Sequence, residues 1–275
     1  METINFTLDR EKCIRCNACV KDCTRHIIHS NGGYPEIPAA EEKDCIRCQH
    51  CMAICPTGAI SILGLLPENS LPVETVAPDA MSRFVRSRRT VRQYRKENVD
   101  RALIDKLLAD TAHAPTGGNT CDLTFSVIDD RKEISRIVAA LMDHLSKSTV
   151  ELSDFMRNAL EEYQRSGADE IFRGAPHLLI VSAGEKAYCG DADVVIAVSY
   201  FELLAQAHGL GTTWCYFLKF ILNTFPELGC LFGISTERPF CPIAFGLPAI
   251  QYARTVQRDQ AATIKTIKFD RDANA

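Results

Sequence analysis

Long apolar runs are missing from this chain of 275 residues. No stretch approaches the ~18 apolar residues of a membrane-spanning helix, so we expect no membrane span. The first eight residues, Met-Glu-Thr-Ile-Asn-Phe-Thr-Leu, have neither a basic start nor an apolar core, so we expect no secretory leader and a cytoplasmic protein. Charge of one sign is not in large excess, since the formal net charge is -4, and we expect no nucleic-acid partner.

Cysteine, in contrast, is abundant, with 13 residues in the chain. Eight of them form two runs of one spacing, Cys-x-x-Cys-x-x-Cys-x-x-x-Cys, which are Cys13, Cys16, Cys19 and Cys23, then Cys45, Cys48, Cys51 and Cys55. This repeated spacing is typical of two [4Fe-4S] clusters, which carry electrons singly. Disulfides and zinc sites are the alternatives. Cytosolic thiols stay reduced, however, and zinc does not require the third and fourth cysteines of each run.

Residues 4–64 resemble the bacterial two-cluster ferredoxins, most closely over Cys48-Gln-His-Cys-Met-Ala-Ile-Cys-Pro-Thr-Gly-Ala59. One departure is Thr24, which stands where that family has proline, but Thr24 is not a ligand. The resemblance implies that the fourth cysteine of each run crosses to the other cluster. Cluster one would then take Cys13, Cys16, Cys19 and Cys55, and cluster two would take Cys45, Cys48, Cys51 and Cys23.

The rest of the chain is long enough for one sizeable domain with its own core. Three prolines between residues 67 and 78 interrupt regular structure, which indicates a short, rather stiff linker. We therefore predict a cluster domain over residues 1–64, a linker over 65–78 and a second domain over 79–275. The cysteines outside the two runs are irregularly spaced and are interpreted as small buried hydrophobic residues. They are Cys121, Cys189, Cys215, Cys230 and Cys241.

Hydrophobic periodicity predicts alternating helices and strands in the second domain. Helices are expected over residues 80–87, 99–112, 131–146, 149–165 and 191–208, with Asp79 as a helix N-cap, and strands over 123–127, 177–183, 212–217 and 240–246. The helix over 191–208 is apolar nearly all round, which is typical of a buried helix or a subunit interface. No Gly-x-Gly-x-x-Gly loop follows the first strand, so a dinucleotide-binding fold is not indicated.

Arginine is concentrated at the start of the second domain. Seven basic residues and no acid lie between Arg83 and Lys96, around a threonine at position 90. A solvated basic face is one reading. Because the planar guanidinium matches phosphate and a hydroxyl adds a donor, a ligand that carries phosphate is the sharper interpretation.

Five segments in order make residues 80–260 similar to the nitroreductase family of FMN proteins. They are Arg86-Ser-Arg-Arg-Thr-Val-Arg-Gln-Tyr94, Ala114-Pro-Thr-Gly-Gly-Asn119, Gly174-Ala-Pro-His-Leu-Leu-Ile-Val181, Ala205-Gln-Ala-His-Gly-Leu-Gly-Thr-Thr-Trp214 and Ala244-Phe-Gly-Leu-Pro248. The resemblance implies an α+β chain, with the small ferredoxin-like domain followed by a central mixed, mostly antiparallel sheet flanked by helices. It also implies a homodimer with FMN at the subunit interface.

The resemblance also assigns site residues. The FMN phosphate and ribityl chain would be held by Arg88, Arg89, Thr90 and Arg92, with Arg254 and Arg258 closing on the phosphate. The partner subunit would contribute Pro115, Thr116 and Asn119. The reactive face of the flavin would be lined by Trp214, Cys215, Tyr216 and Phe217, of which Cys215 and Tyr216 are candidate proton donors.

Two departures from the family concern the substrate side of the flavin: the loop continues as Thr120-Cys121-Asp122-Leu123, and bulky Tyr216-Phe217 stand where small or acidic residues are common. We expect an oxidoreductase that moves electrons from the clusters to FMN and on to a small organic acceptor of nitroaromatic, quinone or activated-alkene type. Reduced ferredoxin or NAD(P)H would be the donor. The alternative is an electron-transfer module that serves a partner protein and has no small substrate, because bulky Tyr216 and Phe217 would suit a closed flavin face. A third possibility is a scaffold that has lost FMN, against which the arginine cluster argues.

Overall fold

The computed structural model describes residues 3–268. The cysteine-rich segment folds into a small unit whose two ends are joined by an antiparallel pair of strands, β1 (Thr7–Leu8) and β4 (Ile60–Ser61). A second antiparallel pair and three short helical turns complete this unit, namely β2 (His29–Asn31), β3 (Tyr34–Glu36), α1 (Ala18–Asp22), η1 (Glu42–Asp44) and α2 (His50–Ala53).

The two cysteine runs adopt the same backbone. In each run, the residues directly before and after the second cysteine have positive φ, namely Arg15 (57°), Asn17 (57°), Arg47 (56°) and Gln49 (61°). A left-handed residue reverses the chain tightly, so the three nearby cysteines of each run can face one small volume. A short helix then begins just before the third cysteine of each run. The little core of the unit includes Cys19 and Cys51 themselves.

The second domain is built on a four-stranded sheet of order β5-β6-β8-β7, in which every neighbouring pair is antiparallel. Its strands are β5 (Leu123–Ile128), β6 (His177–Ala183), β8 (Phe240–Gly246) and β7 (Gly211–Trp214). A parallel bridge between Thr90 and Thr212 lies at the β7 edge and adds a mixed element. The predicted mixed, mostly antiparallel sheet is therefore confirmed.

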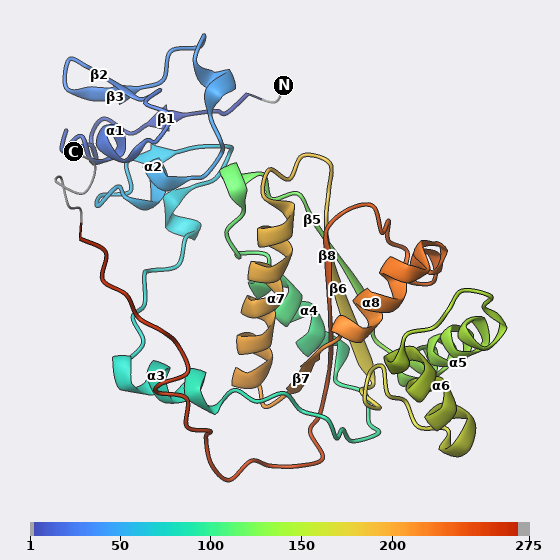
Figure 1. Cartoon of the computed structure of the whole chain (residues 1–275). Coiled ribbons are helices and arrows are strands. Elements are labelled where there is room, and N and C mark those ends of the chain that lie inside the picture. Colours follow the sequence, from blue (N-terminus) through green and yellow to red (C-terminus); the bar gives the residue numbers. More distant parts are fainter. Residues whose placement is uncertain (1–2, 269–275) are drawn as a thin grey trace, which may run out of the picture.

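Helices cover both faces of this sheet (Figure 1). One hydrophobic core lies under α5, α6 and α8, and a second lies under α4 and α7. The helices of this part of the chain are α3 (Pro78–Ser87), α4 (Arg101–Thr111), α5 (Arg131–Lys147), α6 (Asp154–Ser166), α7 (Gly190–Ala207) and α8 (Tyr216–Thr224), with shorter turns η2 (Pro67–Asn69), η3 (Gly117–Asn119) and η4 (Pro226–Phe232).

Helix α7 is buried, as its apolar composition predicted. Val194, Ala197 and Phe201 are at most 1% exposed and pack against the sheet. Two carboxylates, Asp193 and Glu202, are nevertheless buried in the same helix, with 2% and 7% exposed. Because a buried charge is costly unless it is paired, each of these carboxylates must have a partner in the fold.

Some sequence-based boundaries were wrong. The strand predicted over residues 212–217 ends at Trp214, and helix α8 begins at Tyr216. Helix α6 begins at Asp154 rather than 149, because the Ser153 side chain caps it by accepting a hydrogen bond from the Met156 amide. Helix α3 begins at Pro78, so Asp79 lies in its first turn rather than at the N-cap.

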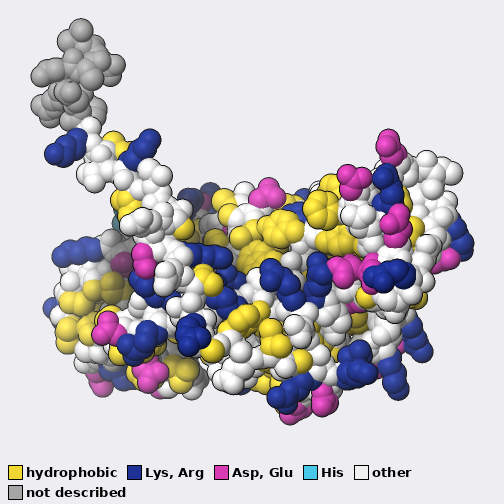
Figure 2. All heavy atoms as spheres, turned by 60° about the horizontal axis from the view of Figure 1, so that its bottom comes forward, with side chains coloured by type: hydrophobic (Ala, Val, Ile, Leu, Met, Phe, Trp, Pro, Cys, Tyr) yellow, Lys and Arg dark blue, Asp and Glu magenta, His cyan; other side chains and the backbone are white. Residues whose placement is uncertain are grey.

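The cysteine-rich unit lies beside the end of α7 from which that helix starts, next to η3 (Figure 1). An extended segment leads from η2 to α3, and the residues after β8 run back past α3 toward the cysteine-rich unit. Figure 2 turns the bottom of Figure 1 toward the viewer and shows hydrophobic, basic and acidic side chains mixed on that surface. No helix in residues 3–268 is long and apolar enough to cross a membrane.

Candidate functional site

Two hollows in the cysteine-rich unit are each lined by four cysteines. The first, enclosing about 330 Å³ with some open solvent, is lined by Cys13, Cys16, Cys19 and Cys55. The second, enclosing about 380 Å³ on the same basis, is lined by Cys23, Cys45, Cys48 and Cys51. The fold thus brings together the two sets of four cysteines that the crossover arrangement requires. The last cysteine of each run lines the hollow formed by the first three cysteines of the other run.

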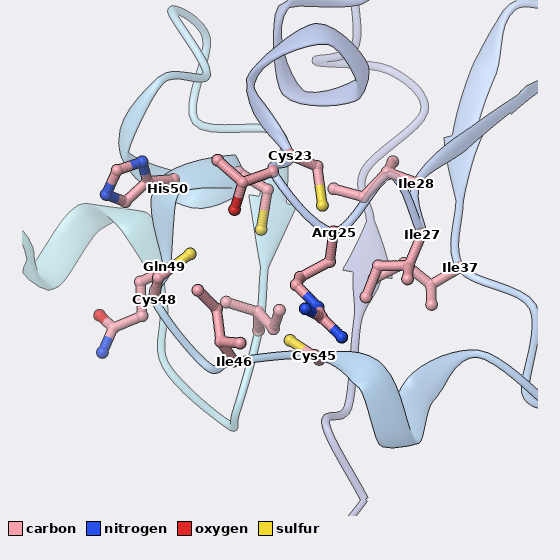
Figure 3. A pocket seen from close by; sticks show the side chains of 13 residues that line it. Cys23, Arg25, Ile27, Ile28, Ile37, Cys45, Ile46, Cys48, Gln49 and His50 are labelled. Atoms are coloured by element: carbon pink, nitrogen blue, oxygen red, sulfur yellow. The ribbon is translucent and has the colours of Figure 1, made fainter. Parts of the chain in front are cut away.

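Thiols of the second hollow point into it. Figure 3 shows the sulfur atoms of Cys23, Cys45 and Cys48 directed into the second hollow. Backbone amides donate to thiol sulfur: the Arg47 N–H lies 3.4 Å from Cys45 Sγ, and the Ala59 N–H lies 3.2 Å from Cys55 Sγ. Such hydrogen bonds are the contacts by which a protein tunes an iron–sulfur cluster.

The same geometry disfavours the two alternatives. All 13 cysteines lie within the described residues 3–268, and the structure pairs none of them in a disulfide there. Within residues 3–268, no group of three or more His, Cys, Asp or Glu is placed to hold a single metal ion. Four thiols spaced around a hollow suit a metal cluster better than one tetrahedral zinc ion. The donor set and the space therefore fit a [4Fe-4S] cluster in each hollow.

Burial opposes ionisation of the deepest thiols when no metal is bound. It raises the pKa of Cys51 to about 12 and raises that of Cys19 as well. The pKa of Cys55 is lowered although burial opposes this, because the Ala59 amide donates to its sulfur. A metal site needs thiolates, so binding of a cluster would release protons here.

The arginine segment lies along the β7 edge of the sheet. Arg88 Nη1 donates to Glu202 Oε1 at 3.2 Å, and the Thr212 hydroxyl donates to the same carboxylate oxygen at 3.3 Å. The Val91 amide donates to the Thr212 carbonyl, and the Tyr252 hydroxyl donates to the Thr90 carbonyl. Glu202 therefore has its partners, and residues 88–91 are held between α7, β7 and the segment after β8.

Part of this arginine segment keeps unused donors. Arg89 donates to the Arg86 carbonyl through Nη2, but its Nε is buried without a partner. Arg92, Arg254 and Arg258 are exposed. An orphaned guanidinium nitrogen beside exposed arginines fits the phosphate-binding role that was predicted for this segment.

The predicted flavin-facing residues lie at a turn from strand to helix. Trp214 ends β7, Cys215 is the N-cap of α8, and Tyr216 begins that helix. Cys215 is 1% exposed, and burial raises its pKa to about 12. Tyr216 is 54% exposed and stacks on Trp214 with ring centroids 6.2 Å apart. Of the two candidate proton donors, only Tyr216 is exposed.

The loop that carries Pro115, Thr116 and Asn119 touches both the second domain and the cysteine-rich unit. The Gly117 amide donates to Asp193 Oδ1 at 2.9 Å, which gives that buried carboxylate a partner. Asn119 Nδ2 donates to the Ile46 carbonyl at 2.9 Å. Ile46 also lines the second hollow. The amide of Asn119 thus points at a cluster loop.

Within one chain the arginine segment and this loop lie at opposite ends of α7. Their partners on that helix, Glu202 and Asp193, are nine residues apart, which is about 14 Å along the axis. Sequence reasoning missed both carboxylates. The available signal was a charged residue inside a helix that is otherwise apolar, because burial forces such a residue to find a specific partner.

Three other cysteines were predicted wrongly. Cys121, Cys189 and Cys230 are exposed, whereas Cys215 and Cys241 are buried as expected. Cys121 and Cys189 lie around the 115–121 loop. The Cys121 thiol contacts Asn119 Oδ1 at 3.8 Å, and the Cys189 side chain lies against Gly117.

Comparison with known families identifies both parts of the chain. The model described as "Nitroreductase family" matches residues 85–247, and the one described as "4Fe-4S dicluster domain" matches residues 12–59. Since the first match covers more than half of the chain, the chain belongs to the nitroreductase family. It is an oxidoreductase of that family with an iron–sulfur domain of ferredoxin type at its N-terminal side.

Solved structures share the fold of the second domain. A nitroreductase with bound FMN from Bacteroides fragilis is 19% identical, with a TM-score of 0.54 over 67% of this chain and 98% of that chain. A nitroreductase with bound FMN from Desulfitobacterium hafniense is 17% identical, with a TM-score of 0.52 over 67% and 97% of the two chains. An FMN-dependent nitroreductase from Mycobacterium smegmatis, solved with NADPH, is 18% identical, with a TM-score of 0.50 over 68% and 99%. No curated protein matches the chain.

Proposed function

We propose that this chain is an iron–sulfur flavoprotein in which electrons travel from two [4Fe-4S] clusters to FMN and on to a small organic acceptor. The acceptor would be a nitroaromatic compound, a quinone or an activated alkene. The observation that carries the proposal is the pair of four-cysteine hollows beside a domain of the nitroreductase family. We retain 1–64, 65–78 and 79–275 as the cluster domain, linker and FMN domain.

FMN is proposed because solved relatives of the same fold contain it and because this chain has a fitting anchor. The anchor would be formed by Arg88, Arg89, Thr90 and Arg92, with Arg254 and Arg258. Bound FMN supplies chemistry that protein side chains lack, since it exchanges electrons singly or in pairs. The strand-to-helix turn at Trp214–Phe217 would orient the flavin, and the exposed Tyr216 hydroxyl would hold a proton for the acceptor.

A homodimer would complete the site. Within one chain, the loop with Pro115, Thr116 and Asn119 and the arginine segment lie at opposite ends of α7, about 14 Å apart along its axis, and the family resemblance implies that this loop serves the flavin of the partner subunit. A second copy brings the loop of one chain to the arginines of the other. Exposed apolar side chains of the linker and the C-terminal segment would be buried in such an interface: Leu71 (91%), Val73 (94%) and Ile264 (91%).

The test is anaerobic turnover of the purified protein with reduced ferredoxin and, separately, with NAD(P)H. Cys13→Ser and Cys45→Ser each remove a cluster ligand, and Cys230→Ser is the matched control at an exposed cysteine outside the hollows. We expect ferredoxin-driven reduction of a quinone or nitroaromatic compound to be lost in the first two variants and kept in the third. Equal rates in all three would contradict the relay. Electron transfer only to another protein would favour the electron-transfer module.

A further inference from the structure

One peptide group connects the 115–121 loop to the second cysteine hollow. Asn119 Nδ2 donates to the Ile46 carbonyl oxygen at 2.9 Å. The N–H of the same peptide group belongs to Arg47 and donates to Cys45 Sγ at 3.4 Å. A continuous chain of two hydrogen bonds therefore runs from the side-chain amide of Asn119 to a sulfur atom that faces the second hollow.

The loop is held in the conformation that this contact needs. Gly118, Asn119 and Cys121 have φ of 62°, 54° and 49°, so three of four consecutive residues are left-handed. The Gly117 amide is fixed by the buried carboxylate of Asp193, and the Cys121 amide donates to the Thr116 hydroxyl at 2.9 Å. Asparagine tolerates positive φ better than most residues, which suits it to position 119.

The first cysteine run is placed differently. Its equivalent of Ile46 is Ile14, since each follows the first cysteine of its run, and the Ile14 side chain is 63% exposed. The second run therefore contacts the second domain through Asn119 at Ile46, whereas the equivalent position of the first run, Ile14, is exposed. This asymmetry distinguishes two hollows that are otherwise alike in ligands and backbone.

Hydrogen bonds to cluster sulfur stabilise the reduced, more negative state and raise the reduction potential. A donor on the carbonyl of a peptide polarises that peptide and strengthens its own N–H donor. We propose that Asn119 is a positioning residue that raises the potential of the cluster held by Cys23, Cys45, Cys48 and Cys51. This cluster would then be the one that passes electrons to the second domain, and the other cluster would receive them from the donor.

This inference rests on the proposed function, because it requires both clusters to bind. The experiment is a redox titration of the complete protein, followed by electron paramagnetic resonance. Asn119→Gly removes the amide and keeps the backbone free to adopt positive φ. Asn119→Asp has nearly the same shape but replaces the donor with a negative charge. Asn5→Gly is the control, since Asn5 is an exposed asparagine with φ of 45° in the cysteine-rich unit.

Of the two midpoint potentials, we expect one to become more negative in Asn119→Gly and still more negative in Asn119→Asp, while the other stays constant. Asn5→Gly is expected to change neither. Unchanged potentials in both Asn119 variants, or equal shifts of both clusters, would overturn the inference. Iron analysis separates failure of this inference from failure of the proposed function. Two clusters require about eight iron atoms per chain, so a much lower iron content would contradict the proposed function itself.

Discussion

The ion pair between Arg88 and Glu202 offers a quantitative test of the fold around the proposed phosphate anchor. Glu202 is 7% exposed, and it accepts hydrogen bonds from Arg88 and from the Thr212 hydroxyl. In Arg88→Ala the carboxylate keeps only the Thr212 hydroxyl and stays buried in α7. The free energy of unfolding should therefore fall, because an uncompensated charge remains in the core.

The expected magnitude follows from burial. Removing one partner of a fully buried pair costs about 3–5 kcal/mol. The Arg88 side chain is 27% exposed, so water can partly solvate the Glu202 carboxylate once the arginine is removed. We therefore expect the free energy of unfolding to fall by about 2–3 kcal/mol. With a urea dependence of about 2–3 kcal/mol per molar for a domain of this size, the unfolding midpoint should fall by about 1 M. Glu202→Gln removes the charge, so Arg88→Ala should cost far less in that background.

Urea unfolding followed by fluorescence of Trp214, the single tryptophan of the chain, reports on the second domain. The four proteins of the double-mutant cycle give the coupling energy between the two side chains. Any loss of FMN binding in the Arg88 variants occurs in both backgrounds and cancels. A coupling energy near zero, or an Arg88→Ala midpoint equal to that of the parent, would refute the buried ion pair.

Three further predictions concern pH, packing and cluster ligation. Burial lowers the pKa of His177 to about 4, so this side chain binds a proton more readily in the unfolded protein than in the folded one. The free energy of unfolding should therefore be highest above about pH 6.5 and lower by about 2 kcal/mol at pH 5. The urea midpoint of His177→Gln should not show this pH dependence. Gly246→Ala would place a methyl group 2.5 Å from the Pro176 ring, and calorimetry should show a destabilisation of about 1–3 kcal/mol; an unchanged melting temperature would contradict this packing. Cys23→Ala and Cys45→Ala should each remove about half of the iron, because both cysteines are assigned to one cluster. The double variant should also lose only about half, and loss of all iron from the double variant would refute the crossover.

Much of the architecture could be predicted from local patterns. Cysteine spacing indicated two clusters. Apolar patterns predicted a long helix over residues 191–208, which the structure has at 190–207, and strands over 177–183 and 240–246, which it has at those residues. These predictions succeed because an apolar segment must be buried, regardless of which other element packs against it. The strand predicted over 212–217 failed at its end. Nothing in the apolar run Trp-Cys-Tyr-Phe-Leu distinguishes a strand from a buried helix. In the structure, pairing with β8 ends at Trp214, opposite Ile243, and α8 begins at Tyr216.

By itself, the sequence determined the chemistry that the chain offers: eight thiols at cluster spacing, and an arginine segment within a family pattern. Only the tertiary structure decided which cluster loop adjoins the second domain. Asn119 and Ile46 are far apart in the sequence, and no motif pairs them, yet they share a hydrogen bond of 2.9 Å. The reason is that ligand spacing depends on local backbone geometry, whereas contact between domains depends on how two independently formed surfaces fit together.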